Sequence, residues 1–122
     1  MQRSTKQRRA IQATLSSSAR PLSPKEIVQL AQKQGEILSL TTVYRSLKLM
    51  VENGDLAHAE IPGQPARYEV AGLDHHHHFH CEDCDRLFDI PGCPSKVHSL
   101  APAGFVTRAH DLTLRGTCPD CS

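Results

Sequence analysis

The sequence predicts an α+β protein: an N-terminal winged helix-turn-helix followed by a small C-terminal α/β domain with a four-cysteine zinc site. Three observations lead to this fold class. Apolar residues recur at helical spacing through most of residues 1–53, and two short strand-like runs follow them. Two Cys-x-x-Cys pairs lie in the second half of the chain. Charge is divided unevenly, because residues 1–70 hold ten lysines and arginines against six acidic residues, and residues 71–122 hold four against seven.

The length of 122 residues allows one ordinary domain or two very small ones. We expect a winged-helix domain over residues 1–70, a hinge over 71–75 and a metal-binding domain over 76–122. Each small domain alone buries little apolar surface, so a metal or a dimer interface is expected to stabilise it. The basic front half suits a polyanion, and the acidic, His- and Cys-rich back half suits cations.

Nothing in the chain has the character of a membrane segment. No run of about 18 apolar residues occurs. The basic start of the chain does not lead into the apolar segment of a signal peptide. We therefore expect no membrane partner and a reducing, cytoplasmic location.

Capping signals mark the first two helices. The first is expected from Ser4, which opens a capping box, to about Leu15. The second is expected to begin after the N-cap Ser23, because Pro24 suits the first helical position and Glu26 completes a capping box. A glycine at position 35 supplies the stop signal.

The third helix is expected over residues 40–52. Its apolar stripe is expected to be buried and consists of Leu40, Val43, Leu47, Met50 and Val51. Wing strands over residues 56–61 and 66–70 follow, separated by a Pro-Gly-Gln-Pro turn. The third helix of a winged helix-turn-helix enters the major groove. The residues expected to contact DNA, rather than to form a merely solvated face, are Thr41, Thr42, Tyr44, Arg45, Ser46 and Lys48.

The cysteine spacing predicts one closed zinc site in the second domain. Cys81 and Cys84 form one knuckle and Cys118 and Cys121 the other, and two knuckles fill the four positions of tetrahedral Zn²⁺. Disulfides are disfavoured in a reducing compartment, and neither pair has the strand-to-helix setting of a redox motif. We expect strands near residues 78–81 and 86–90, a short helix over 94–100 and a last strand around 109–115.

One cysteine is left over. Cys93 is open to three interpretations: a free thiol, a metal ligand, or a small apolar residue, of which we favour the last.

The run of histidines before the first knuckle predicts further metal sites. In an extended segment alternate side chains point to opposite faces, so His76, His78 and His80 share one face and His75 and His77 share the other. Imidazoles suit Zn²⁺ and Fe²⁺, and added carboxylates favour Fe²⁺ and Mn²⁺. Candidate partners of the first face are His58, Glu69 and Asp89; His110 is a candidate for the second, with a half-buried strand histidine as its alternative. A solvated polar run is the alternative for the whole segment.

These motifs together resemble the ferric uptake regulator family. The run Thr42-Val43-Tyr44-Arg45 is similar to the family's recognition helix, and the histidine-rich segment ending in Cys81-x-x-Cys84 is similar to its metal-binding segment. The resemblance covers nearly the whole chain. It implies a homodimer of winged-helix domains on α/β dimerisation domains, which binds pseudo-palindromic double-stranded DNA when a regulatory metal is bound.

The resemblance also implies where the metals bind. The sensing site falls on Glu69, His76, His78 and Asp89, and an accessory site falls on His75 or His77 with His110. Many iron- and peroxide-sensing members have a histidine just before the second helix, which this chain lacks. Zinc-sensing members take a ligand from the first wing strand, where His58 lies.

We therefore expect a repressor that controls zinc uptake, with structural Zn²⁺ and a regulatory Zn²⁺. An iron- or peroxide-sensing regulator with Fe²⁺ or Mn²⁺ at the same ligands is the alternative. A zinc hydrolase would need an open metal position beside a general acid or base, and a metal-storage protein would leave the helix-turn-helix without a purpose. We expect no enzyme activity.

Overall fold

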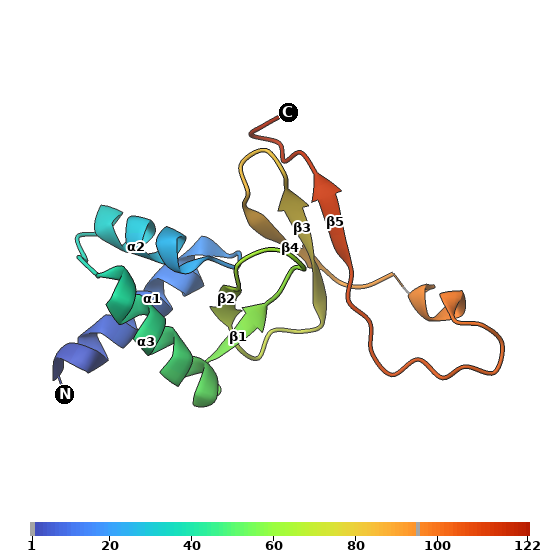
Figure 1. Cartoon of the computed structure of the whole chain (residues 1–122), viewed down its shortest axis with the longest axis horizontal. Helices are drawn as coiled ribbons and strands as arrows, with labels where there is room; N and C mark the ends of the chain where they lie inside the picture. Colours follow the sequence, from blue (N-terminus) through green and yellow to red (C-terminus); the bar gives the residue numbers. More distant parts are fainter. Residues whose placement is uncertain (1, 95) are drawn as a thin grey trace. The chain divides into compact units, whose positions relative to one another are not determined.

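The computed structural model describes residues 2–94 and 96–122. Its internal contacts divide the chain into two compact units, Met1–Gly72 and Leu73–Ser122, each of which has its own sheet (Figure 1). Among the described residues, no helix is long and apolar enough to cross a membrane.

The first unit is a three-helix bundle with a two-stranded wing. Its elements are α1 (Gln2–Ser18), α2 (Pro24–Lys33), α3 (Leu40–Glu52), β1 (Leu56–Ala59) and β2 (Arg67–Val70). The predicted capping box of α2 is confirmed, since the Ser23 side chain accepts from the Glu26 N–H and the Glu26 carboxylate accepts from the Ser23 N–H. The prediction that Ser4 caps α1 is wrong, because α1 already includes Gln2.

The core of this unit orients α3. Ten side chains from all three helices, the segments just before α2 and α3, and the first wing strand form it: Ile11, Leu15, Leu22, Ile27, Ala31, Leu38, Val43, Leu47, Met50 and Leu56. The predicted stripe of α3 is confirmed at its centre, whereas Leu40 is exposed and Val51 only packs against the edge of the core. The outward face of α3 is therefore held in place by burial of the opposite face.

The wing is an antiparallel ribbon joined to the bundle. Gly63, with a φ of +78°, follows Pro62 in the turn, and the Gln64 N–H donates to the Ile61 carbonyl at 3.0 Å. A positive φ at that position suits glycine. Leu22 and Tyr68 exchange backbone hydrogen bonds of 2.9 and 2.8 Å, so the wing is tied to the segment before α2.

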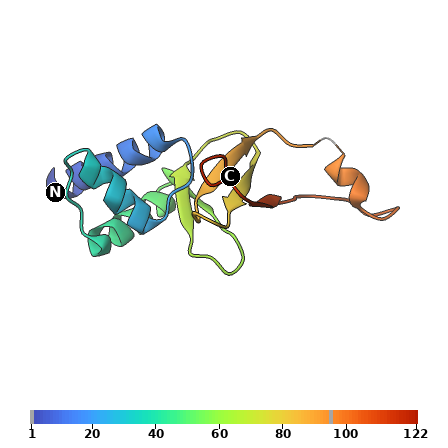
Figure 2. The same ribbon diagram turned by 90° about the horizontal axis from the view of Figure 1, so that it is seen from above.

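The second unit is a three-stranded sheet with an excursion. Strands β3 (His76–Cys81), β4 (Leu87–Pro91) and β5 (Thr113–Gly116) lie in the order β4-β3-β5, antiparallel between β3 and β4 and parallel between β3 and β5. Between β4 and β5 the chain leaves the sheet, as Figure 2 shows, and carries the 3₁₀ helix η1 (Val97–Leu100).

Two predictions for this unit are corrected. The helix expected over residues 94–100 is only the turn η1, and one of its predicted residues, Ser95, lies outside the described residues. The last strand begins at Thr113, so His110 precedes it rather than lying in it. Both errors fall in a segment rich in Pro and Gly, where side-chain periodicity is a weak guide.

The core of the first unit predicts a sharp contrast between two leucines of α3. Leu47 is fully buried, whereas Leu49 is 48% exposed. Leu47→Ala should lower the free energy of unfolding by about 2–5 kcal/mol because it leaves a cavity. Leu49→Ala should change it by less than about 0.5 kcal/mol. Denaturant unfolding of the zinc-loaded chain, followed by circular dichroism, measures both, and equal losses would place α3 differently on the bundle.

Candidate metal centres and nucleic-acid interface

The four predicted zinc cysteines come together in the second unit. The Sγ atoms of Cys81, Cys84, Cys118 and Cys121 all lie within 4.8 Å of one another, and those of Cys84 and Cys118 are 3.8 Å apart. Thiolates about 2.3 Å from a tetrahedral Zn²⁺ are about 3.8 Å apart. The donor set and its spacing therefore fit a closed structural zinc site with no open position for a substrate.

The electrostatics of the group favour a bound cation. The backbone N–H of Cys84, together with that of Cys118 at 3.3 Å from the sulfur, lowers the pKa of the Cys81 thiol to about 6. A hydrogen bond with the Cys118 side chain, then burial, and also repulsion by the charge of Cys118 raise the pKa of Cys121 to about 12. A divalent cation removes that repulsion, and its binding releases protons.

His80 belongs to the first knuckle rather than to a histidine site. Asp85 ends the knuckle with a φ of +62°, and its N–H donates to the Cys81 carbonyl at 2.8 Å. His80 Nε2 lies 2.7 Å from Asp85 Oδ1. His80 therefore contacts the turn that shapes the cysteine site, and it does not join His76 and His78 in a histidine site as strand alternation predicted.

The first histidine face holds a carboxylate between two imidazoles. His78 and Asp89 are directly opposite in the β3–β4 pairing, so their side chains share a face. Asp89 Oδ1 lies 3.5 Å from the Nε2 atoms of both His76 and His78. His76 Nδ1 is 2.8 Å from the Asp74 carbonyl, which fixes Nδ1 as the donor and turns the Nε2 lone pair toward Asp89. Two nitrogens and an oxygen thus converge.

The second histidine face is a fuller group. The three Nε2 atoms of His75, His77 and His110 form a triangle with sides of 3.1, 3.1 and 3.2 Å. The parallel pairing of β3 with β5 leads to it: His78 pairs with Thr113, and His75 and His110 each lie three residues before one member of that pair, outside the two strands. Burial lowers the pKa of His77, and the neighbouring His75 and His110 lower it further, so its ring is the neutral form that binds metals.

Cys93 lies beside this group, whereas the favoured sequence interpretation made it a small apolar residue and left a metal ligand as an alternative. Its Sγ lies 2.9 Å from His110 Nε2 and 3.3 Å from His77 Nε2, and its side chain is exposed rather than packed in a core. The favoured interpretation as a small apolar residue is therefore wrong. Gly92, with a φ of +82°, turns the chain at the end of β4 just before Cys93. The sequence signal that could have favoured a metal ligand is a cysteine in a Gly-Cys-Pro turn directly after a strand that carries another candidate ligand.

The wing places His58 and Glu69 on opposite faces. In the β1–β2 pairing His58 is opposite Tyr68 and Glu69 is opposite Ala57, and successive residues of a strand alternate faces. The His58 ring packs edge-on against Tyr68, with centroids 5.1 Å apart. The prediction that His58 and Glu69 bind one ion is therefore wrong for this wing. Glu69 itself remains a predicted ligand.

The outward face of α3 carries four of the six predicted DNA contacts: Thr41, Tyr44, Arg45 and Lys48 are exposed. Ser46 is 7% exposed and lies on the inner face beside Leu47, so its predicted DNA contact is wrong. Thr42 bonds with the N-cap Ser39 through both its N–H and its hydroxyl, so its role here is to begin the helix. A helical face exposes only those positions that the core does not need.

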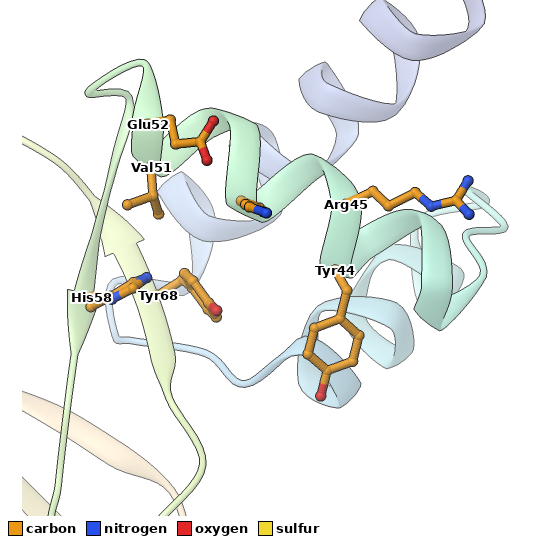
Figure 3. A pocket seen from close by; sticks show the side chains of 7 residues that line it. Tyr44, Arg45, Val51, Glu52, His58 and Tyr68 are labelled. Atoms are coloured by element: carbon orange, nitrogen blue, oxygen red, sulfur yellow. The ribbon is translucent and has the colours of Figure 1, made fainter.

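Between α3 and the wing lies an open pocket of about 570 Å³. Tyr44, Arg45 and Lys48 line it from α3, with His58 and Tyr68 from the wing, and Figure 3 shows Tyr44 and Arg45 leaving the outer side of the helix. Val51 and Glu52 complete its lining. The two cations, the two phenols and the imidazole suit phosphate and base edges, whereas the Glu52 carboxylate does not suit phosphate. His58 therefore belongs to this surface.

Known proteins are similar to this chain in sequence and in fold. The Ferric uptake regulator family matches residues 2–115. The zinc uptake regulation protein of Mycobacterium tuberculosis is 32% identical over 124 residues, covering 98% of this chain and 94% of the relative. The peroxide operon regulator of Bacillus subtilis is 30% identical over 124 residues, covering 98% and 84%. The structure of a zinc-bound manganese uptake regulator superposes with a TM-score of 0.78, at 26% identity, covering 92% of this chain and 87% of that one.

The four-cysteine group predicts that metal and fold are lost together. Cys81→Ser should release one zinc per chain and unfold the second unit, because such a site contributes folding free energy directly. Cys93→Ser, which removes a thiol outside the group, should keep that zinc and the circular dichroism spectrum. The zinc that remains after mild chelation, measured by mass spectrometry, distinguishes the two variants, and a folded Cys81→Ser chain that still retains this zinc would refute the assignment.

Proposed function

The chain belongs to the ferric uptake regulator family of metal-responsive transcription regulators, and we propose that its regulatory signal is zinc. In this proposal a homodimer binds operator DNA and represses uptake genes when the regulatory site of each chain is filled. The observation that carries the choice of zinc is the match to a zinc uptake regulation protein, which is 32% identical to this chain over 124 residues.

The imidazoles of the first histidine face suit Zn²⁺ and Fe²⁺ better than Mn²⁺, which carboxylate oxygens suit. Asp89 is the carboxylate that the second unit contributes to this face. The sequence identity to a zinc uptake regulation protein, over almost the full length of both chains, supports the choice of zinc.

The regulatory site in this proposal is the first histidine face. His76, His78 and Asp89 would hold the ion, with Glu69 of β2 as the expected fourth ligand. In this proposal, ligands from both units hold the same ion. The hinge leaves the winged helices free to adopt several separations, and ligands on both sides of it favour the separation that matches two half-sites. Only such a difference in affinity between states can couple metal to DNA.

The outer face of α3 reads DNA in this proposal, and the second unit forms the dimer. Residues 1–70 carry a net charge of +4, which suits the phosphate backbone. Leu100, Phe105 and Val106 are 83, 71 and 82% exposed on the excursion between β4 and β5. Large apolar side chains that are this exposed on one segment are typical of a surface that a partner covers, and in this proposal the partner is a second copy of this chain. Two-fold symmetry predicts a pseudo-palindromic operator.

The carboxylate of the first face gives a direct test of the switch. In wild type, Zn²⁺ should raise the affinity for an operator selected from random duplexes by about 5–150-fold, the usual range of such coupling. Asp89→Ala should abolish that rise but keep the four-cysteine zinc and the dimer. Asp74→Ala is the matched control, because it removes a nearby carboxylate and keeps the backbone carbonyl that orients His76. An unchanged zinc response in Asp89→Ala would exclude this face as the switch.

A separate experiment is needed to identify the regulatory metal. Zn²⁺ binds more tightly than Mn²⁺ or Fe²⁺ to almost any such site, so metal affinity does not decide it. The DNA affinity of each fully metal-loaded form, measured in the absence of oxygen, decides which metal regulates the protein. Tight binding by the Zn²⁺ form alone supports the proposal. If the Fe²⁺ form binds as tightly, and dilute peroxide then abolishes binding and oxidises a histidine, the protein is a peroxide sensor.

The recognition helix predicts the effect of one arginine. Arg45→Ala should weaken operator binding by about 1–3 kcal/mol, roughly 5- to 150-fold, if the guanidinium reaches a base edge. Lys33→Ala removes the same charge from the last turn of α2, outside the predicted DNA contacts, and should have little effect. A mobility-shift titration of zinc-loaded protein on operator and scrambled duplexes tests both. Equal weakening on both duplexes would mean that Arg45 contacts phosphate only.

A further inference from the structure

The second histidine face has a geometry that hydrogen bonds alone do not satisfy. Each Nε2 atom is either a donor or an acceptor along a single direction. Three Nε2 atoms that point at one another, at 3.1–3.2 Å, can form one hydrogen bond among them, and the remaining contacts bring lone pair against lone pair. A cation at the centre of the triangle accepts all three lone pairs at once.

Cys93 adds a fourth donor at the position that a tetrahedron requires. Around Zn²⁺, with Zn–N of about 2.0–2.1 Å and Zn–S of about 2.3 Å, neighbouring donors are about 3.3–3.6 Å apart. Here the two shortest sulfur-to-nitrogen distances are 2.9 Å, to His110, and 3.3 Å, to His77, and all four donor atoms lie within 4.8 Å of one another. Small outward shifts of the side chains give the coordination distances.

We propose that Cys93 completes a three-histidine, one-thiolate centre that binds Zn²⁺, and that the thiolate is its metal-selecting ligand. The resemblance to the family accounts for the histidines of this face but not for a sulfur donor. The four ligands close the coordination sphere, so the centre binds an ion without activating water. The proposal does not depend on which metal operates the DNA switch, since it uses none of the ligands on the first face.

The thiolate changes what the centre can bind. Three neutral imidazoles and one thiolate leave a net charge of +1 around Zn²⁺, and the soft sulfur disfavours Mn²⁺ and Fe²⁺ relative to a carboxylate. The alternative use of the Cys93–His110 contact is a reactive thiolate activated by the imidazole. That alternative requires only one histidine, and it leaves the convergence of His75 and His77 without a cause.

Cobalt substitution tests the proposal with a signal specific to sulfur. Protein whose four-cysteine group is first filled with Zn²⁺ is titrated with Co²⁺, and zinc retention is checked by mass spectrometry. A sulfur-to-cobalt charge-transfer band in the near ultraviolet should appear and saturate at one Co²⁺ per chain. The first histidine face cannot produce this band because it contains no thiol. In Cys93→Ser the band should be lost while Co²⁺ at the first face remains.

Two further variants make the result specific. Cys93→Asp keeps a ligand but changes sulfur to oxygen, so Co²⁺ should still bind in tetrahedral geometry without the band. His98→Gln is the matched control: the His98 ring lies 5.1 Å from that of His110, yet it contributes no donor to the group, and the band should be unchanged. A band of equal strength in Cys93→Ser, or no band in wild type together with rapid alkylation of Cys93, would overturn the proposal.

Discussion

The strict alternation of side chains along β3 is the constraint on which the metal chemistry depends. β3 is the central strand of its sheet, so β4 fixes one of its edges and β5 the other. The antiparallel register supplies Asp89 to the face of His76 and His78, and the parallel register supplies His110 to the face of His75 and His77. A shift of one residue in either pairing would exchange the faces and separate every donor from its partners.

The structural zinc site and the two histidine faces are therefore coupled through one strand. β3 ends at Cys81, whose thiol joins Cys118 just beyond the end of β5. An ion at the cysteines fixes the carboxyl ends of both strands of that parallel pairing, and with them the register that forms the histidine groups. In this account, folding depends on the zinc at the four cysteines, which is retained with the fold. Metal sensing depends on ions at the histidine faces of the same strand, which bind and dissociate with the metal supply.

The sequence predicted those features whose signals are local. The Ser23–Glu26 capping box, the bounds of α3 and the two cysteine knuckles depend on residues a few positions apart, and the structure shows all of them. The errors concern tertiary placement. Ser46 and Thr41 have similar polarity, and only the core decides which of them faces inward. His58 and Glu69 are separated by the register of a ribbon, and Cys93 reaches its histidines through a turn that helical periodicity cannot describe.

The central claim is that one strand presents separate metal centres on its two faces, beside the four-cysteine site. Crystals of the zinc-saturated protein, measured at the zinc absorption edge, test it most directly through the anomalous difference map. The account predicts three peaks per chain, one for each ligand group: one among the four cysteines, one beside His76, His78 and Asp89, and one among His75, His77, Cys93 and His110. A single peak at the cysteines, or one ion shared by histidines of both faces, would contradict it.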